Sequence, residues 1–215
     1  MTIASQLLYT FGYIPLLNLP ALSHAVPVAK ALLNGGARAV EITFRTADAA
    51  AGIKLIAKEV PELFIAAGTV RTKGQVDAAA EAGAKMIISP ALNQDIIEYC
   101  TAKEIPVIPA CATSSEVDFA LRLGLDAVKL FPANVLGVQT AKAFSGPFPE
   151  MCYLITGGVT QDNLAEYLEV KNVAACAGTG LVTSDDYANS DWMGIEEKTK
   201  MLFSIVSKYR KSTGG

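Results

Sequence analysis

Lys129 lies in the middle of a short apolar segment, residues 125–133, that contains β-branched and aromatic side chains and a proline near its end. These features are typical of a buried strand. Because strand side chains alternate, Ala127, Lys129 and Phe131 share one face of it. Burial favours the neutral form of an amine, which is a nucleophile that attacks carbonyl carbons. The alternative is a lysine at the strand end whose ammonium group reaches water.

A second charged residue, Glu41, stands between the apolar residues Val40 and Ile42 in another strand-like segment. If both neighbours pack against helices, Glu41 faces the interior. A carboxylate near a buried lysine is suited to general acid–base catalysis, and the alternative is a structural ion pair. Arg45 follows this strand, where its guanidinium could bind a substrate carboxylate or remain a solvated loop side chain.

Strand-like and helix-like segments alternate along the chain and would position these residues. A leading helix is expected in residues 1–11. The predicted strands cover residues 13–19, 38–43, 63–67, 85–89, 105–108, 125–133, 152–155 and 173–175. The predicted helices cover residues 20–34, 48–58, 75–82, 93–103, a segment from Ser114 or Ser115 to Gly124, and residues 138–144, 161–168 and 192–209.

This alternation predicts a parallel sheet. After each strand, the helix carries the chain back to the end of the sheet where that strand began, so the next strand runs parallel to it. Units of roughly 25 residues fit an α/β fold, a (β/α)8 TIM barrel with a leading N-terminal helix, and the alternative is an open doubly wound sheet. We expect one domain spanning residues 1–215, since no linker or change in composition divides the chain.

In such a barrel, catalytic residues project from the carboxyl ends of the strands. At these ends Thr69 offers a hydroxyl, next to a glycine that permits close backbone approach, and Pro90 would fix the rim of a pocket. Glycine-rich turns follow the last two predicted strands, at residues 156–160 and 176–180. Turns at these places favour a phosphate site, because main-chain N–H groups converge on the anion. Each turn alone could equally be only a tight loop.

Composition excludes several classes of partner. The net charge is −3 and no basic block occurs, which argues against nucleic acid and anionic membrane surfaces. No apolar run is long enough to span a membrane, and residues 1–6 lack the features of a signal peptide. The cysteines (Cys100, Cys111, Cys152 and Cys176) form no C-x-x-C pair. We therefore expect a cytoplasmic protein with reduced, mostly buried thiols.

Metal and cofactor signals are weak. The single histidine, His24, is expected to be a surface or packing residue, and no cluster has zinc spacing. No G-x-G-x-x-G opens a helix after a strand, which argues against a dinucleotide. A magnesium site made of carboxylates alone stays open. We expect no metal and no cofactor.

The chain resembles the 2-keto-3-deoxy-6-phosphogluconate (KDPG) aldolase and 4-hydroxy-2-oxoglutarate (KHG) aldolase family from about Pro15 to Val182. The motifs that carry the resemblance are Val40-Glu41-Ile42-Thr43-Phe44-Arg45-Thr46, Ala67-Gly68-Thr69-Val70, Ile88-Ser89-Pro90, Val128-Lys129-Leu130-Phe131-Pro132-Ala133, Gly146-Pro147-Phe148 and Thr156-Gly157-Gly158-Val159. Their combination in this order and spacing is highly specific.

The resemblance implies a class I aldolase, a homotrimer in the Entner–Doudoroff pathway, that forms a Schiff base with its keto-acid phosphate substrate. Such enzymes cleave KDPG to pyruvate and D-glyceraldehyde 3-phosphate, and 4-hydroxy-2-oxoglutarate to pyruvate and glyoxylate. By matching positions it implies these roles: Lys129 as Schiff-base lysine, Glu41 as acid–base, Arg45 and Thr69 near the carboxylate, Pro90, Phe131 and Thr156 in the pocket, and Gly157, Gly158, Gly178 and Thr179 at the phosphate.

The chain also departs from the family pattern. Many members have serine where Thr179 stands, Gly-Gly at 177–178, Pro-Gly after the fifth strand, and glutamate at Asn134. These changes leave the lyase chemistry intact and the preferred substrate open. Alternatives are a 2-dehydro-3-deoxy-6-phosphogalactonate aldolase, a metal-dependent pyruvate aldolase or sugar-phosphate isomerase on the same scaffold, and a non-catalytic binder of phosphorylated ligands.

Overall fold

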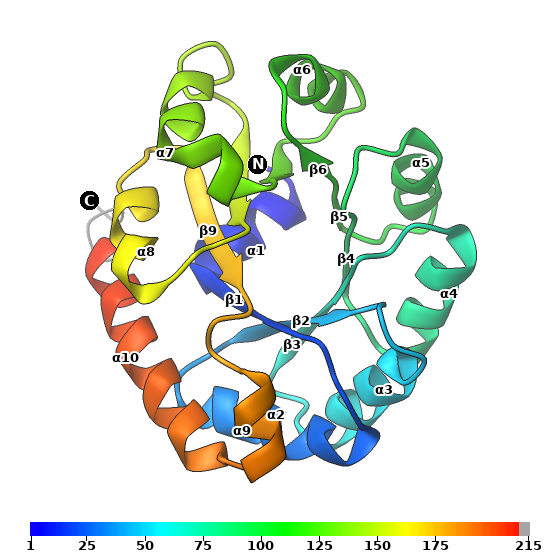
Figure 1. The fold of residues 1–215 in the computed structure, drawn as a ribbon. Helices are drawn as coiled ribbons and strands as arrows, with labels where there is room; N and C mark the ends of the chain where they lie inside the picture. The colour runs from blue at the N-terminus through cyan, green and yellow to red at the C-terminus, as the bar shows by residue number, and fades with distance from the viewer. Residues whose placement is uncertain (211–215) are drawn as a thin grey trace.

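A computed structural model describes residues 1–210 and shows a parallel, nearly closed barrel surrounded by helices (Figure 1). The order of neighbouring strands is β5-β4-β3-β2-β1-β9-β8-β7-β6. The strands are β1 (Tyr13–Leu17), β2 (Ala39–Thr43), β3 (Phe64–Gly68), β4 (Met86–Ile88), β5 (Val107–Ile108), β6 (Ala110–Cys111), β7 (Ala127–Leu130), β8 (Cys152–Thr156) and β9 (Val173–Gly178). This confirms the predicted TIM barrel over the open sheet.

The predicted fifth strand, residues 105–108, is interrupted at Pro109. β4 pairs with β5 before this residue, and β6 pairs with β7 after it. Proline has no N–H to donate, so it interrupts the ladder hydrogen bonds. β5 and β6 therefore occupy the place of one barrel strand, and the eight predicted units account for the nine short strands.

The helices follow the predicted order with shifted ends, except that the short helix α9 was not predicted. They are α1 (Ile3–Phe11), the 3-10 helix η1 (Leu22–His24), α2 (Ala25–Asn34), α3 (Ala49–Glu59), α4 (Lys73–Ala82), α5 (Gln94–Ala102), α6 (Ser114–Arg122), α7 (Ala133–Phe144), α8 (Gln161–Leu168), α9 (Ser184–Asn189) and α10 (Trp192–Arg210). The segment predicted as one helix over residues 20–34 begins as the 3-10 turn. The helix expected from Val138 begins at Ala133 and contains a non-helical Gly137.

Side chains form two apolar layers, as the strand alternation requires. Helices cover the outer layer, where Val40, Ile42 and Val128 are buried. The inner layer fills the barrel with small and branched residues such as Ala66 and Leu154. The residue face predicted for Lys129 is confirmed, since its strand neighbours Val128 and Leu130 belong to the outer layer.

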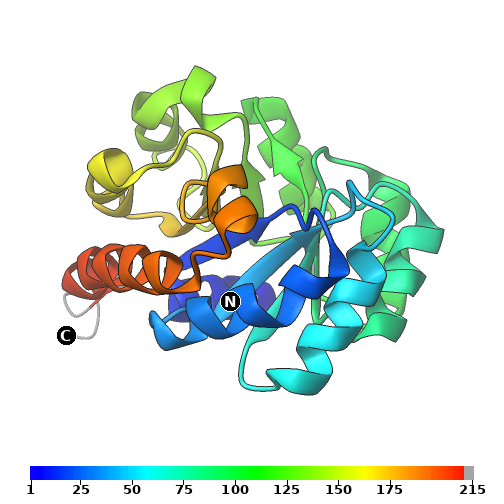
Figure 2. The same cartoon turned by 60° about the horizontal axis from the view of Figure 1, so that its bottom comes forward.

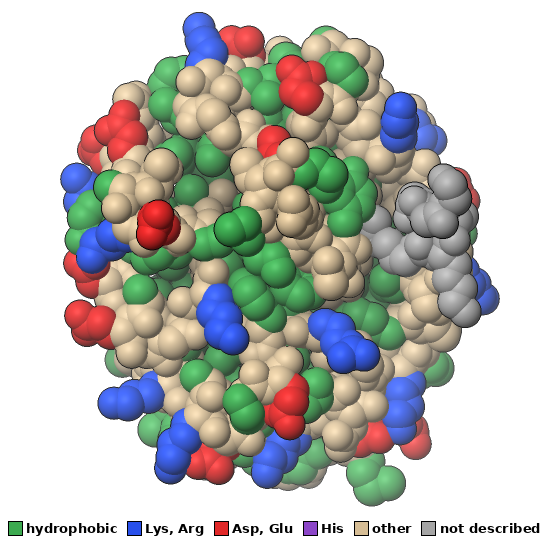
Figure 3. Space-filling view, turned by 180° about the vertical axis from the view of Figure 1, so that it is seen from behind, with side chains coloured by type: hydrophobic (Ala, Val, Ile, Leu, Met, Phe, Trp, Pro, Cys, Tyr) green, Lys and Arg blue, Asp and Glu red, His purple; other side chains and the backbone are tan. Residues whose placement is uncertain are grey.

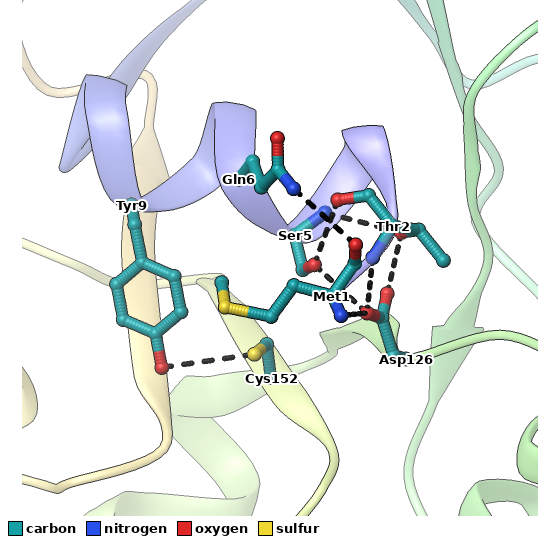
Figure 4. Close-up of polar contacts among 7 residues, drawn as sticks. All are labelled: Met1, Thr2, Ser5, Gln6, Tyr9, Asp126 and Cys152. Atoms are coloured by element: carbon teal, nitrogen blue, oxygen red, sulfur yellow. Dashed lines mark hydrogen bonds and ion pairs between the residues drawn. The ribbon is translucent and has the colours of Figure 1, made fainter.

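Helix α1 covers one end of the barrel (Figure 2), where its Leu8 and Phe11 join the inner layer. Asp126 at the start of β7 anchors this helix by accepting hydrogen bonds from Thr2 and Ser5 (Figure 4). Seen from behind, this end carries hydrophobic side chains near its centre with lysines and arginines around them (Figure 3). The carboxyl ends of the strands lie at the opposite end of the barrel, which we call the mouth.

Two further expectations concern residues within 1–210. Among these residues none of the four cysteines forms a disulfide bond, and all four are buried, as predicted. Over the same residues, the model contains no helix with the length and apolar character that crossing a membrane requires.

Candidate active site

Lys129 and Glu41 meet inside the barrel from β7 and β2. The Lys129 Nζ lies 3.8 Å from the Glu41 Oε1, and the two side chains are 6% and 0% exposed. Val40 and Ile42 pack on the outer layer, which turns Glu41 inward as predicted. The buried position is the one found for Lys129, and the alternative of an ammonium group that reaches water at the strand end is wrong, because the side chain is enclosed. An amine and a carboxylate therefore share an apolar interior.

The Glu41 carboxylate occupies an unusual electrostatic setting. Burial raises its pKa above the ordinary carboxyl value, while the nearby charges of Lys129 and Arg45 act in the opposite direction. Neither of its oxygens accepts a hydrogen bond from any residue that the structure describes. A carboxyl group with a raised pKa and free oxygens is suited to take up and return a proton.

Arg45 and Thr69 lie at the mouth, just beyond the ends of β2 and β3. The Arg45 Nε donates a hydrogen bond to the Thr69 Oγ1 at 3.3 Å. Thr69 has a φ of 60°, which is uncommon for a residue other than glycine. The remaining guanidinium donors of the exposed Arg45 are thus available at the rim, above the buried Glu41.

The three predicted pocket-wall residues lie on different strands around the lysine. The Lys129 Nζ is 5.4 Å from the centre of the Phe131 ring, which is half-buried at the end of β7. Thr156 is buried at the end of β8, and its Oγ1 has no hydrogen-bond partner within residues 1–210. Pro90 is half-buried just after β4. Each of the three lies two residues after an inward-facing strand residue, in the direction of the mouth.

The two glycine-rich turns lie side by side, because β8 and β9 are paired with Thr156 opposite Ala177. Gly157 and Gly158 have φ values of 105° and 70°, a region that L side chains rarely adopt. A Cβ on Gly158 would lie 2.6 Å from the Asn134 Cβ, so this turn is seated tightly against the start of α7.

Gly178 ends β9 in equally close surroundings. A Cβ there would lie 2.8 Å from the Tyr13 hydroxyl oxygen and 3.2 Å from the Val159 carbonyl oxygen. Thr179 follows it and is exposed. The structure therefore brings all four predicted phosphate-site residues to one sector of the mouth, with a hydroxyl at its edge.

A cavity of about 410 Å³ adjoins this sector, between the end of β1 and the loop that follows β9. Its walls include Asn18, His24, Thr179 and Tyr187. The His24 ring stacks on Tyr187 with centroids 5.2 Å apart, so its expected packing role is confirmed.

Sequence reasoning missed two polar residues at this edge of the mouth. The Thr43 Oγ1 donates a hydrogen bond to the Asn18 Oδ1 at 3.2 Å. Thr43 lies two residues after the inward-facing Glu41, and Asn18 two residues after Leu16, which pairs with Glu41. The signal was therefore available in the alternation of each strand. Separately, the described residues contain no cluster of three or more His, Cys, Asp or Glu side chains that could hold a metal ion.

Comparison with known proteins gives a consistent result. The family model "KDPG and KHG aldolase" matches residues 5–198. The chain is 40% identical over 192 residues to KHG/KDPG aldolase of Escherichia coli strain K12, covering 89% of this chain and 90% of that protein. It is 36% identical over 194 residues to 2-dehydro-3-deoxy-phosphogluconate aldolase of Treponema pallidum, covering 90% and 92%.

A solved structure is also similar. KDPG aldolase from Legionella pneumophila superposes with a TM-score of 0.90 at 34% identity, covering 94% of this chain and 98% of that one. That crystal structure contains pyruvate captured at low pH as a covalent carbinolamine intermediate.

Proposed function

The chain belongs to the KDPG and KHG aldolase family, and we propose that it is a class I aldolase that cleaves KDPG to pyruvate and D-glyceraldehyde 3-phosphate. By the same chemistry it cleaves 4-hydroxy-2-oxoglutarate to pyruvate and glyoxylate. The observation that carries the proposal is the enclosed pair of Lys129 and Glu41, with 3.8 Å between the Nζ and the Oε1.

In the proposed reaction, the unprotonated Lys129 amine attacks the C2 carbonyl carbon of the substrate and forms a carbinolamine. Loss of water gives an iminium, which draws electrons toward C2. Glu41 removes the proton of the C4 hydroxyl through a water molecule, and the C3–C4 bond breaks to give the aldehyde and an enamine. Glu41 then returns a proton to C3, and hydrolysis of the iminium releases pyruvate and restores the amine.

The remaining residues hold the substrate. Arg45 and Thr69, linked by their 3.3 Å hydrogen bond, bind the carboxylate next to C2. Phe131, Pro90 and Thr156 form the wall around the reacting carbons. The adjacent turns that contain Gly157, Gly158, Gly178 and Thr179 bind the distal phosphate, which the pairing of β8 with β9 supports.

The activity is tested by incubating the purified protein with KDPG and measuring pyruvate release with a coupled dehydrogenase. We expect turnover that excess chelator does not change. Turnover abolished by the chelator would instead indicate a metal-dependent aldolase, and phosphate-ester binding without turnover would indicate a ligand-binding protein. Relative rates on KDPG, its galactonate isomer and 4-hydroxy-2-oxoglutarate would establish the preferred substrate.

We further propose that residues 1–215 form one catalytic domain that acts as a homotrimer in the cytoplasm, at the aldol cleavage step of the Entner–Doudoroff pathway. Membership of the family supports these assignments.

A further inference from the structure

Gly68 ends β3 directly beside the strand that carries Glu41. Residues of the two strands pair in register, with Glu41 opposite Ala66 and Thr43 opposite Gly68. Ala66 belongs to the inner layer, so Gly68, two residues later, faces the barrel interior as well. The Glu41 side chain extends toward the mouth and lies over Gly68.

No side chain fits at position 68 while Glu41 stays in place. A Cβ on Gly68 would lie 2.5 Å from the Glu41 Cδ and 2.6 Å from its Cγ, and would also overlap the Oε1. Gly68 is not among the glycines with a positive φ, so an alanine could adopt its backbone conformation. The need for glycine at this position comes from the carboxylate above it.

Packing and an ion pair hold this carboxylate, without hydrogen bonds. Its two oxygens accept no hydrogen bond within the described chain, and its charged neighbour, the Lys129 Nζ, is 3.8 Å away. A buried carboxylate is usually held by several donors. We infer that Gly68 is a positioning residue for the reaction: its missing side chain forms the hollow that seats the Glu41 carboxylate within reach of carbon atoms bound to Lys129.

This inference rests on the proposed function and predicts a split between two steps. Covalent capture of pyruvate depends on the Lys129 amine, while proton exchange at the pyruvate methyl carbon, C3, depends on Glu41. A misplacement of about 1 Å costs roughly 10²-fold in rate. Gly68→Ala should therefore slow C3 exchange about 10²-fold and leave unchanged the fraction of Lys129 that a short borohydride pulse reduces at saturating pyruvate.

Both quantities are measurable on the full chain. Proton NMR follows the exchange of the pyruvate C3 hydrogens in D2O, and mass spectrometry measures the adduct on Lys129 after borohydride reduction. The matched control is Gly74→Ala on α4, where an added Cβ has no atom within 4 Å, and neither quantity should change. Gly52→Ala crowds the Leu19 side chain outside the barrel interior, and it should lower stability without changing the exchange rate of folded protein.

Removing the carboxylate gives the coupling test. Glu41→Ala removes the Cγ, the Cδ and both oxygens, which clears the space above position 68. It should slow exchange in the parent chain, and adding Gly68→Ala should then slow exchange no further. If Gly68→Ala alone does not fold, the double variant should fold, because the clash is gone.

Three results decide the matter. The inference would be overturned if folded Gly68→Ala exchanged the pyruvate C3 hydrogens at the rate of the parent protein. It would also be overturned if the two substitutions slowed exchange additively in the double variant, or if the double variant did not fold. If the parent protein, without any substitution, traps no pyruvate, the proposed aldolase function is refuted instead. A failure of the inference can therefore be distinguished from a failure of the proposed function.

Discussion

Glu41 is the residue whose buried environment most needs an explanation. Burying a carboxyl group without hydrogen-bond donors costs free energy, and the raised pKa of Glu41 reflects that cost. The benefit is chemical, since a proton-transfer group works best when its pKa lies near the working pH. Arg45 and Lys129 limit the increase, so all three side chains are coupled.

The coupling predicts a shift in pH dependence for Arg45→Gln. As a base, Glu41 acts when deprotonated, so kcat should fall as the pH drops through its raised pKa. Arg45 lowers that pKa, and its removal should move the acidic limb of the kcat profile to higher pH. The measurement is kcat at saturating substrate across the acidic range.

The control for this shift is Arg38→Gln, an exposed arginine immediately before β2, which should leave the limb in place. An acidic limb that moved to lower pH, or did not move in Arg45→Gln, would show that Glu41 does not determine it.

For individual residues, the alternation of side chains along a strand predicted the orientation of Lys129 and Glu41, because side-chain direction in a strand follows from position alone. The same rule would have found Asn18 and Thr43. The contact between Gly68 and Glu41 could not be predicted with its distances, since it depends on the course of a long side chain across a neighbouring strand.

Among the elements, helix α1 has a structural role that can be tested through Asp126. Partial burial acts to raise the Asp126 pKa, but hydrogen bonds from Thr2 and Ser5 and the N-terminal amine hold it below the usual value. A depressed carboxyl pKa contributes stability above the unfolded-state value of about 3.9, and this contribution is lost as the pH falls through the folded-state value.

We expect Asp126→Ala to lower the free energy of unfolding by about 1–2 kcal/mol at neutral pH, because it leaves the Thr2 and Ser5 donors without their partner. Denaturant titration should show this difference shrinking as the pH falls below about 3.9. Asp118→Ala, which removes an exposed ion pair with Arg122, should cost less than about 1 kcal/mol. An equal loss in both variants would argue against the anchoring role.

The turns after β8 and β9 predict a substrate-dependent effect of Thr179→Ala. If the Thr179 hydroxyl binds the phosphate, its loss should raise KM for KDPG about tenfold, the equivalent of one hydrogen bond to a charged group. The KM for 4-hydroxy-2-oxoglutarate, which has no phosphate, should stay unchanged. Steady-state kinetics on both substrates measures this.

Thr10→Ala, which removes an exposed threonine on α1, is the matched control for Thr179→Ala and should affect neither substrate. A similar rise in KM for both substrates would place Thr179 elsewhere in the reaction.

For the whole molecule, periodicity predicted the barrel because each strand–helix unit must return to the same sheet. Periodicity did not predict the break at Pro109, because that break depends on the local hydrogen-bond geometry between strands. It also did not predict α9, because the sign of this helix is a Thr183–Asp186 capping box in a short polar segment. The closure of one barrel end by α1 depends on contacts between residues distant in sequence, such as Thr2 with Asp126.

The proposed homotrimer is a prediction about the whole particle. Light scattering on the purified protein should give three times the 22.6 kDa of one chain. A mass of one or two chains would show that the family assembly does not extend to this protein.

The proposed reaction requires a covalent bond between the Lys129 amine and the substrate. The most direct measurement is borohydride reduction in the presence of pyruvate, followed by peptide mass mapping. We expect a reduced pyruvate adduct on Lys129, lost in Lys129→Met and retained in Lys85→Met, which replaces an exposed lysine immediately before β4. An unmodified Lys129, or an adduct on a different lysine, would contradict it.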